Sequence, residues 1–308
     1  MSSPLDPSNR DDYCYRHPDR QSFALCQRCG RTICGECQTQ SAVGVLCPEE
    51  FRAERRAASP AGRFSSRMRG LARAGAPVVT YAIMAIAGVA YVLQFLLPFA
   101  LGSDVVGRLL MYGPVFTTLA PGAPFEPWRM LTYAFVHGSI LHIAFNLITL
   151  WMFGRVLEQA FGPLRYALLF IVAAMGGALA TAIVAPGSFV IGASGAIFGM
   201  FGAYFFVMRQ ARMDTRSLLV LVAINVVMGF VVSGIAWQAH IGGLVVGGAA
   251  GAILVRDARR AAIESVRFDG GAAGRSRRLG NSAGLWGLVG LGVAVAALTI
   301  VFSTLNVR

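Results

Sequence analysis

The sequence predicts an all-α protein that crosses a membrane several times and begins with a small Cys-rich module. The first observation is composition: 56% of the 308 residues are hydrophobic and only 14% are charged, whereas soluble domains carry roughly 25% charged residues. The second is a series of apolar stretches, each near the roughly 17–25 residues that a helix needs to cross a bilayer. The third is that all six cysteines lie between Cys14 and Cys47, ahead of the first apolar stretch.

Residues 1–50 have the ligand types and the spacing of a zinc-binding module. Metal-ligating residue types occur there as four pairs with two residues between partners: Cys14 and His17, Cys26 and Cys29, Cys34 and Cys37, and Cys47 and Glu50. Four pairs suit two tetrahedral sites, so we expect one or two structural zinc ions, with alternate pairs sharing a site in a cross-brace as one arrangement. Glu50 is the exception in this pattern. A carboxylate oxygen binds zinc, but this residue could equally be a solvated charge.

Zinc is expected to fold this segment, which is too small to hold a core of its own. Recruitment of a protein partner or a substrate is the second interpretation of the module. Disulfides are the competing use of the cysteines. The charge pattern described next puts the module in the cytosol, where thiols stay reduced, so metal binding is favoured. The spacing resembles that of B-box-like zinc modules.

Arginine accounts for all 27 basic residues, and the arginines cluster beside apolar stretches. A net charge of +12 would suggest a nucleic-acid partner in a soluble protein. Here the positive-inside rule explains the arginines better, and no nucleic acid is expected. The linker 51–76 and the loops at 209–216 and 257–283 are basic, whereas the loops at 186–192 and 233–237 carry no charge. With seven spans, this pattern puts the N-terminus and the basic loops in the cytoplasm of a multi-pass cell-membrane protein.

The apolar stretches predict seven helices. We place them at 78–100, 137–157, 164–185, 193–209, 217–235, 238–255 and 284–303. Residues 77–256 would then form a six-helix domain and 257–283 a basic cytoplasmic loop, while 284–308 would hold a seventh helix and a short tail. The segment 101–136 mixes Pro, Gly and apolar residues, so we expect a partly embedded loop instead of a span.

Polar side chains within membrane helices are costly and mark candidate functional sites. Four of them stand out: His142 and Asn146 in the second helix, Ser194 in the fourth and His240 in the sixth. The even-numbered helices run from outside to inside, and each of these residues lies in the first two turns or so of its helix. At 1.5 Å per residue they lie roughly 3–14 Å below the outer surface. The pattern therefore predicts one polar site near that surface.

The residue types suggest catalytic roles. A serine hydroxyl needs an adjacent base to become a useful nucleophile, and His240 is the only histidine of the later helices. His142 and Asn146 are spaced i, i+4 on one helix face, and both can donate hydrogen bonds to an oxyanion. No carboxylate is placed to complete a triad, so we predict a Ser–His dyad. Each residue also has a plainer interpretation, namely helix packing around Ser194 and interhelical hydrogen bonds for the others.

The motifs between about Trp128 and Gly251 resemble those of the rhomboid family. They are Trp128-Arg129, the run from His137 to Asn146, Gly154 to Glu158, the run from Gly192 to Gly199, and Ala239-His240 followed by Gly243 and Gly247. Two features depart from the simplest bacterial members. Phe198 stands where a tyrosine often packs on the catalytic histidine, and the seventh helix is an addition to a rhomboid-like six-helix core.

The resemblance implies an intramembrane serine protease without a catalytic cofactor. By this resemblance, His142 and Asn146 line the oxyanion hole together with the Ser194 amide. Structural roles are implied for Trp128, Arg129, Glu158, Gly195, Gly199, Gly243 and Gly247. The implied substrates are transmembrane proteins of the lipid bilayer, cleaved in or near their spans.

Two other functions compete with this one. A catalytically inactive rhomboid-like adaptor is the main alternative, although such relatives usually lack Ser or His of the dyad and this chain has both. A transporter or channel is the third class, but the internal repeats that transporters often show are not visible here.

Overall fold

The computed structural model describes residues 12–41, 44–58, 75–101, 103–232, 234–268 and 282–307. The chain divides into two compact units, 1–74 and 75–308. The division falls at the end of the predicted Arg-rich linker. Much of that linker, residues 59–74, lies outside the described residues, as does 269–281 of the predicted basic loop.

The first unit is a small Cys-rich fold. Its elements are the 3-10 turn η2 (Gly35–Cys37), the strands β1 (Thr39–Ser41) and β2 (Gly44–Leu46), and the helix α1 (Pro48–Ala58). The two strands form an antiparallel hairpin in which Gln40 pairs with Val45. Ile33 and Leu46 are the aliphatic side chains of its buried cluster, and the cysteines supply the rest. So few apolar side chains cannot stabilise a fold by burial alone, which agrees with a fold that depends on metal.

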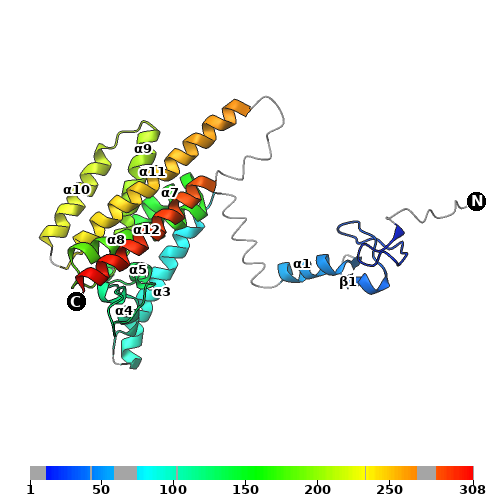
Figure 1. Cartoon of the computed structure of the whole chain (residues 1–308), viewed down its shortest axis with the longest axis horizontal. Coiled ribbons are helices and arrows are strands. Elements are labelled where there is room, and N and C mark those ends of the chain that lie inside the picture. Colours follow the sequence, from blue (N-terminus) through cyan, green and yellow to red (C-terminus); the bar gives the residue numbers. More distant parts are fainter. Residues whose placement is uncertain are drawn as a thin grey trace, which may run out of the picture. The chain divides into compact units, whose positions relative to one another are not determined.

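The second unit is a bundle of helices (Figure 1). Its long helices are α3 (Val78–Leu101), α8 (Pro163–Val184), α9 (Ser194–Gln210), α10 (Arg216–Val231), α11 (Trp237–Phe268) and α12 (Ser282–Asn306). The second predicted span is a continuous helical segment made of α6 (Ile140–Thr149), the π-helical turn η5 (Leu150–Gly154) and α7 (Arg155–Phe161). Each of the seven predicted stretches thus contains a helical segment, although the ends differ. Five of these helices are long and apolar enough to cross a membrane, whereas α9 and α10 have only 17 and 16 residues.

Several helix boundaries differ by three residues or more from the predicted ones. The second span ends at Phe161, the fifth at Val231 and the seventh at Asn306, instead of 157, 235 and 303. Two further differences have a physical reason. The second span begins at Ile140, because the Ser139 hydroxyl accepts a hydrogen bond from the His142 backbone N–H and caps α6. The sixth span continues to Phe268, well past the predicted end at 255. The added residues include Arg259, Ala261 and Ala262, which are good helix formers. The hydropathy pattern locates the end of the apolar stretch and not the end of the helix.

The segment between the first two spans is a folded loop, as predicted. It contains α4 (Val105–Leu110), η3 (Pro114–Phe116), α5 (Arg129–Thr132) and η4 (Tyr133–Phe135). Arg129 is buried at its centre and donates from Nη1 to the carbonyls of Arg108 at 2.6 Å and Met111 at 3.1 Å. The same guanidinium pairs with Glu126 and lies over the Phe116 ring. Arg129 therefore holds the loop together, whereas Trp128 is largely exposed.

The centre of the bundle is built from α8, α9 and α11, which pack closely through small residues. A Cβ on Gly199 would lie 2.8 Å from the Gly243 carbonyl oxygen, and a Cβ on Gly243 would overlap the Gly195 carbonyl. Gly247 meets the Gly199 backbone in the same way. These four glycines, which we call the glycine seam, let α9 and α11 approach at backbone contact.

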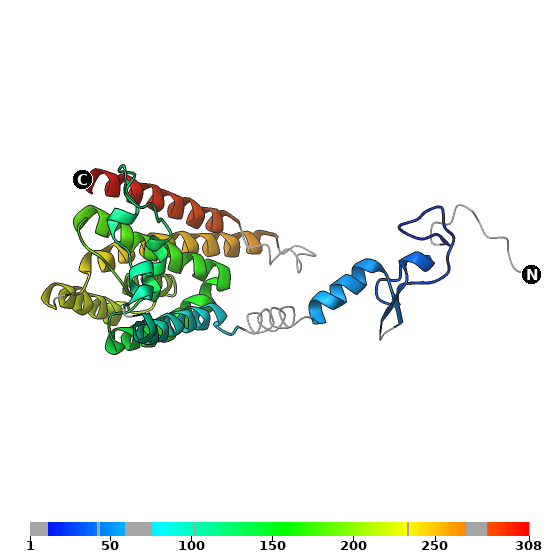
Figure 2. The ribbon, with the colours of Figure 1, turned by 90° about the horizontal axis from the view of Figure 1, so that it is seen from below.

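The remaining helices surround this centre. The seventh helix, α12, lies along α8 and beside α11, as both ribbon views show (Figures 1 and 2). Arg165 on α8 forms an ion pair with the buried Asp257 of α11, with Nη2 and Oδ2 3.0 Å apart. By contrast, α10 lies at the edge of the bundle, and only Leu218 and Gly229 are buried among its residues (Figure 1).

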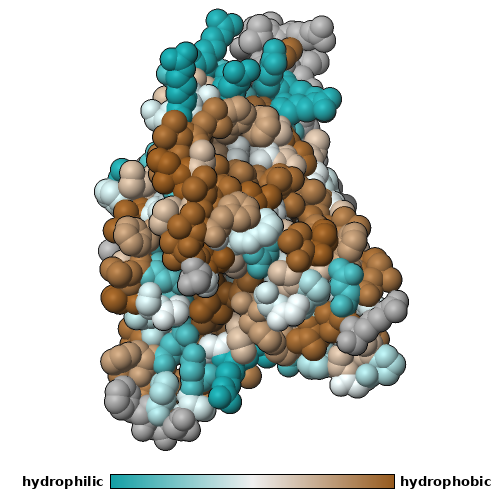
Figure 3. Space-filling model, turned by 90° about the vertical axis from the view of Figure 1, so that its left-hand side faces the viewer, coloured by the Kyte–Doolittle hydropathy of each residue, from teal (hydrophilic) through white to brown (hydrophobic). Residues whose placement is uncertain are grey.

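The surface of the bundle matches a bilayer environment. Large apolar side chains such as Phe95, Phe145 and Val231 are more than 60% exposed. Figure 3 shows hydrophobic side chains covering the middle of one face, with hydrophilic side chains gathered at the top and near the bottom. Monomeric soluble proteins rarely expose so much contiguous apolar surface, whereas lipid solvates it well. The protein is therefore a polytopic membrane protein whose second unit is built from helices.

Candidate active site

Ser194 is the first residue of α9 and directly follows a sharp backbone turn. Gly192, two residues earlier, has φ +109°, and a Cβ there would lie 2.5 Å from Nε2 of His142. Glycine is therefore required both for the backbone conformation and for the space beside the imidazole. Gly192 donates its N–H to the Tyr133 carbonyl at 2.9 Å, which fixes the turn. Because the first N–H groups of a helix have no intrahelical acceptor, the Ser194 amide is free to bind an anion.

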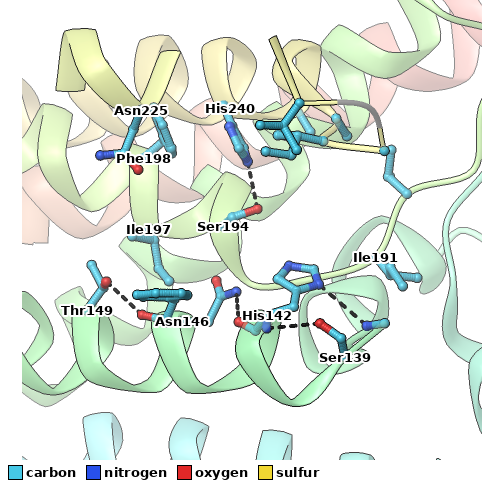
Figure 4. Close-up of a pocket in the computed structure, with 18 of the residues that line it drawn as sticks. Ser139, His142, Asn146, Thr149, Ile191, Ser194, Ile197, Phe198, Asn225 and His240 are labelled. Carbon is cyan, nitrogen blue, oxygen red and sulfur yellow. Dashed lines mark hydrogen bonds between the residues drawn. The ribbon is translucent and has the colours of Figure 1, made fainter. Parts of the chain in front are cut away.

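The structure brings Ser194 and His240 into hydrogen-bond contact. Nε2 of His240 lies 2.8 Å from Oγ of Ser194, across the interface between α9 and α11 (Figure 4). The glycine seam makes this contact geometrically accessible, because Gly195 follows Ser194 directly and Gly243 lies one turn after His240. This is the arrangement in which an imidazole can accept a serine proton.

The imidazole of His240 is held by packing. The Phe198 ring stacks on it with a centroid distance of 4.3 Å and an interplanar angle of 10°. Among the described residues, no hydrogen-bond partner is found for the buried Nδ1 of His240. The imidazole of His240 is thus oriented by an aromatic face, and no carboxylate among the described residues bonds its Nδ1.

His142 and Asn146 face the same site from α6 (Figure 4). Nδ1 of His142 accepts a hydrogen bond from the Gly138 N–H at 3.4 Å, which leaves the ring proton on Nε2. Asn146 is buried, and its Nδ2 donates to the His142 carbonyl at 2.7 Å. An amide nitrogen carries two protons, so one N–H of Asn146 is not used by this bond.

These side chains line a cavity of about 630 Å³ between α6, α9, α10 and α11. Two polar residues of its lining are not singled out in the sequence analysis, namely Thr149 on α6 and Asn225 on α10. Figure 4 shows both on the opposite side of Ser194 from Ile191. A lone Asn within the otherwise apolar stretch Arg216–Val231 is a signal that the sequence does offer.

The predicted structural residues support the site from a distance. Glu158 is buried near the C-terminal end of the second span, and its carboxylate accepts hydrogen bonds from the backbone N–H groups of Val79 at 2.8 Å and Thr80 at 2.7 Å. It therefore caps the start of α3. Tyr133 lies closer to the site. Its hydroxyl donates to the Ala174 carbonyl at 2.8 Å and packs against Gly195, a role that sequence reasoning missed.

The first unit contains two groups of potential metal ligands. Cys14, His17, Cys34 and Cys37 have ligand atoms within 4.8 Å of one another, and so do Cys26, Cys29 and Cys47. The first and third predicted pairs thus meet, and the second pair meets Cys47 of the fourth, which is the order of a cross-brace. Glu50 is not brought into the second group. Its side chain is partly buried and points to Arg28, with Oε2 3.8 Å from Nε of that arginine.

The electrostatics of the first group fit a cation. Burial would raise the pKa of the Cys14 thiol, but backbone hydrogen bonds from Cys34, Arg16 and His17 outweigh it and lower the pKa to about 6. For Cys37, burial and the neighbouring Cys14 and Cys34 sulfurs raise the pKa to about 12. Thiolates crowded in this way repel one another, and a bound Zn²⁺ would remove that repulsion.

Known proteins show similarity to the membrane unit. Residues 124–257 match the Rhomboid domain family model. The chain is 36% identical to the Rhomboid protease GluP of Bacillus subtilis over 185 residues, which is 58% of this chain and 35% of GluP. It is 33% identical to RHOMBOID-like protein 6, mitochondrial, of Arabidopsis thaliana over 140 residues, which is 42% of this chain and 44% of that protein. RHOMBOID-like protein 4 of the same plant is 31% identical over 137 residues, 42% of this chain and 34% of that protein.

The aligned regions span less than half the length of these three relatives. The family-model match begins at residue 124 and therefore does not include the Cys-rich unit. The matched residues nevertheless contain Ser194 and His240, together with α6 and the whole of α8, α9 and α10. The membrane unit therefore contains a match to the Rhomboid domain over residues 124–257, and the chain is similar to rhomboid proteins of a bacterium and a plant.

Proposed function

We propose that this protein is an intramembrane serine endopeptidase that hydrolyses peptide bonds in or near transmembrane segments of membrane proteins. The observation that carries the proposal is the 2.8 Å contact between Ser194 Oγ and His240 Nε2 inside a cavity of the membrane unit. The names of relatives, such as the Rhomboid protease GluP, support the same class of activity. Cleavage of a single-span test substrate in liposomes by the wild type, but not by Ser194→Ala, is the test.

The chemistry follows from the geometry. Ser194 Oγ attacks the scissile carbonyl carbon while His240 Nε2 takes the hydroxyl proton. The resulting oxyanion accepts hydrogen bonds from the Ser194 amide, from Nε2–H of His142 and from Nδ2–H of Asn146. His240 then gives its proton to the departing amine, which leaves an acyl-enzyme. A water molecule attacks this ester, His240 takes the water proton and returns it to Ser194, and the new carboxyl end is released.

The proposed orientation places the N-terminal unit in the cytoplasm and the active site toward the extracytoplasmic side of a cell membrane. Support comes from the two ends of α9. Ser194 begins this helix, whereas Arg209 lies at its far end, followed by Arg212 and Arg216 before α10. Arginines favour the cytoplasmic side, so the catalytic end faces the other side. Substrate segments would then be cut near their outer ends.

Loss of an oxyanion donor should lower turnover without removing it. We expect His142→Ala and Asn146→Ala each to reduce kcat by about 10²–10³, the cost of losing one such donor in soluble serine proteases. The measurement is cleavage of a single-span test substrate in liposomes. Thr149→Val is the matched control, because Thr149 lines the same cavity one turn from Asn146 but bonds only its own helix, through the Phe145 carbonyl at 2.8 Å.

The oxyanion assignment depends on the contrast with that control. Equal losses in Asn146→Ala and Thr149→Val would show that any polar residue of α6 matters in the same way. If Asn146→Ala retained full turnover while His142→Ala failed to fold, both residues would have to be reassigned to a structural clamp.

We also propose that the N-terminal unit binds two structural zinc ions of unequal affinity. Cys14, His17, Cys34 and Cys37 supply a full tetrahedral set, whereas the second group has three cysteines. We expect two Zn²⁺ per chain, with the second released first to a chromophoric chelator. Glu50→Cys should tighten the second site by supplying a fourth thiolate, and Glu50→Gln should leave its affinity unchanged.

The proposed zinc sites should be separate from catalysis. Ser194 lies near the outer face and the zinc unit in the cytoplasm, with a hydrocarbon core of about 30 Å between the faces. A chelator that strips both ions should therefore unfold the first unit, seen by circular dichroism, without slowing cleavage of a test substrate. Loss of the second ion in Glu50→Gln would restore Glu50 as a ligand, and chelator inhibition would show coupling across the membrane.

A further inference from the structure

The C-terminal end of α12 holds the loop between the first two spans through hydroxyl groups. Ser303 is fully buried, and its Oγ lies 2.8 Å from Oγ1 of Thr117, which is also fully buried. One residue further, Oγ1 of Thr304 accepts a hydrogen bond from the Leu119 N–H at 3.0 Å. The seventh helix is thus bonded to the loop in addition to packing on α8.

The hydrogen bonds continue from the loop toward the catalytic turn. Thr117 Oγ1 lies 3.2 Å from the Pro114 carbonyl and 3.1 Å from the Tyr112 hydroxyl. The single proton of Thr117 satisfies the Pro114 carbonyl, so Tyr112 and Ser303 can both donate to its oxygen. The Tyr112 backbone then pairs with Val190, with N–O distances of 3.1 and 2.7 Å.

Val190 belongs to the short segment that ends at Ser194. Two residues on, the Gly192 N–H is held by the Tyr133 carbonyl at 2.9 Å. The position of the Ser194 amide therefore depends on the hydrogen bonds that hold this segment. The backbone pairing of Val190 with Tyr112 is one of them. A donor to an oxyanion acts only when it is placed to within a few tenths of an ångström. A looser pairing of Val190 with Tyr112 would therefore weaken the hydrogen bond from the Ser194 amide to the oxyanion.

We propose that Thr117 and Ser303 are positioning residues for the proposed protease reaction. The chain Ser303–Thr117–Tyr112–Val190, which we call the hydroxyl relay, makes the seventh helix part of the catalytic apparatus. This inference rests on the proposed function, because it concerns the placement of the Ser194 amide. Neither residue touches the substrate or the reacting atoms.

A neighbouring threonine shows what an ordinary buried hydroxyl on α12 looks like. Thr299 lies one turn before Ser303 and is also fully buried, but its Oγ1 donates to the Val295 carbonyl of its own helix at 2.7 Å. A hydroxyl in an apolar environment must find a partner, and the helix backbone is the nearest one. Ser303 instead bonds a residue 186 positions away in the chain. Thr299 is therefore the matched control.

The experiment compares five variants of the full chain in liposomes. Ser303→Ala and Thr117→Val remove relay hydroxyls, Thr117→Ser keeps one, and Thr299→Val is the control, with Ser194→Ala as the inactive reference. We expect kcat to fall about twofold to tenfold in Ser303→Ala and Thr117→Val, the value of a buried hydrogen bond, with KM unchanged. The rate at which a fluorophosphonate labels Ser194 should fall in parallel. Thr117→Ser and Thr299→Val should behave like the wild type.

Two further readouts separate positioning from simple stability. Melting temperatures of Ser303→Ala and Thr299→Val should drop equally, so that stability alone cannot explain a difference in kcat. The double variant Thr117→Val/Ser303→Ala should be no slower than Thr117→Val, because both changes remove the same bond. If Thr117→Val fails to fold, the comparison of kcat and labelling rate between Ser303→Ala and Thr299→Val still tests the positioning role of Ser303.

Equal kcat and equal labelling rates in Ser303→Ala and Thr299→Val would overturn the relay and leave the proposed protease intact. A rise in KM at constant kcat would also overturn it, since that would indicate a role in substrate binding. Retained cleavage in Ser194→Ala would instead remove the proposed function and the relay with it.

Discussion

Replacement of either member of the dyad should abolish proteolysis. We expect Ser194→Ala and His240→Ala each to stop cleavage of a single-span test substrate in liposomes, since the 2.8 Å contact makes the two side chains act as one unit. In a soluble serine protease either loss costs on the order of 10⁶ in kcat, and the double loss costs hardly more. The double variant should therefore be no slower than the singles.

Ser188→Ala is the matched control for this experiment. Ser188 lies six residues before Ser194 in the segment that leads to it, but it is not part of the cavity lining. Its replacement should leave kcat unchanged. Cleavage by Ser194→Ala at the wild-type rate would contradict the proposed chemistry. Substrate binding without cleavage by the wild-type chain would favour the inactive adaptor.

A single methyl group on the glycine seam should be almost as damaging. A Cβ on Gly243 would overlap the Gly195 carbonyl, next to Ser194, so Gly243→Ala must push α9 and α11 apart. Overpacking of this kind typically costs about 1–3 kcal/mol. A misplacement of about 1 Å at a catalytic pair can cost 10²-fold in rate. We therefore expect kcat to fall by about 10² or more, together with a lower melting temperature in detergent.

Gly290→Ala provides the comparison for the seam. Gly290 lies on α12, and no atom lies within 4 Å of the position that a Cβ would take there, so the added methyl group meets only lipid. This variant should keep wild-type activity and stability. Wild-type activity and stability in Gly243→Ala would instead mean that α9 and α11 do not meet through these glycines in the membrane.

The helices of the membrane unit could be predicted because length and hydropathy determine them. The stretch 164–185 is apolar apart from Arg165 near its start and Thr181 near its end, and the structure has α8 at Pro163–Val184. The end of α11 could not be found in this way. Its last turns, around Arg259 and Arg260, are helical and polar, so hydropathy stops before the helix does.

The catalytic candidates can be chosen from the sequence because polar residues are rare in membrane helices. Ser194, His240, His142 and Asn146 stand out on that ground, and the structure gathers all four at one cavity. Asn225 belongs to the same class of signal, but nothing in the sequence places α10 against that cavity.

The hydroxyl relay and the direction of the Glu50 side chain could not be predicted from the sequence for a different reason. Ser303 and Thr117 are ordinary residues whose meaning depends on a contact between distant parts of the chain. Cys47-x2-Glu50 has the spacing of a ligand pair, but spacing does not reveal that the Glu50 carboxylate lies toward Arg28. Local patterns predict elements and candidate residues, whereas side-chain direction depends on tertiary packing.

The most direct test of the central claim is covalent labelling of the nucleophile. The full chain in liposomes is treated with a fluorophosphonate, and the modified peptide is identified by mass spectrometry. We expect a single adduct, on Ser194, that forms at the wild-type rate in Ser188→Ala. The adduct should be absent or form far more slowly in His240→Ala, because His240 takes the hydroxyl proton. An adduct on another serine, or undiminished labelling of Ser194 without His240, would contradict the central claim.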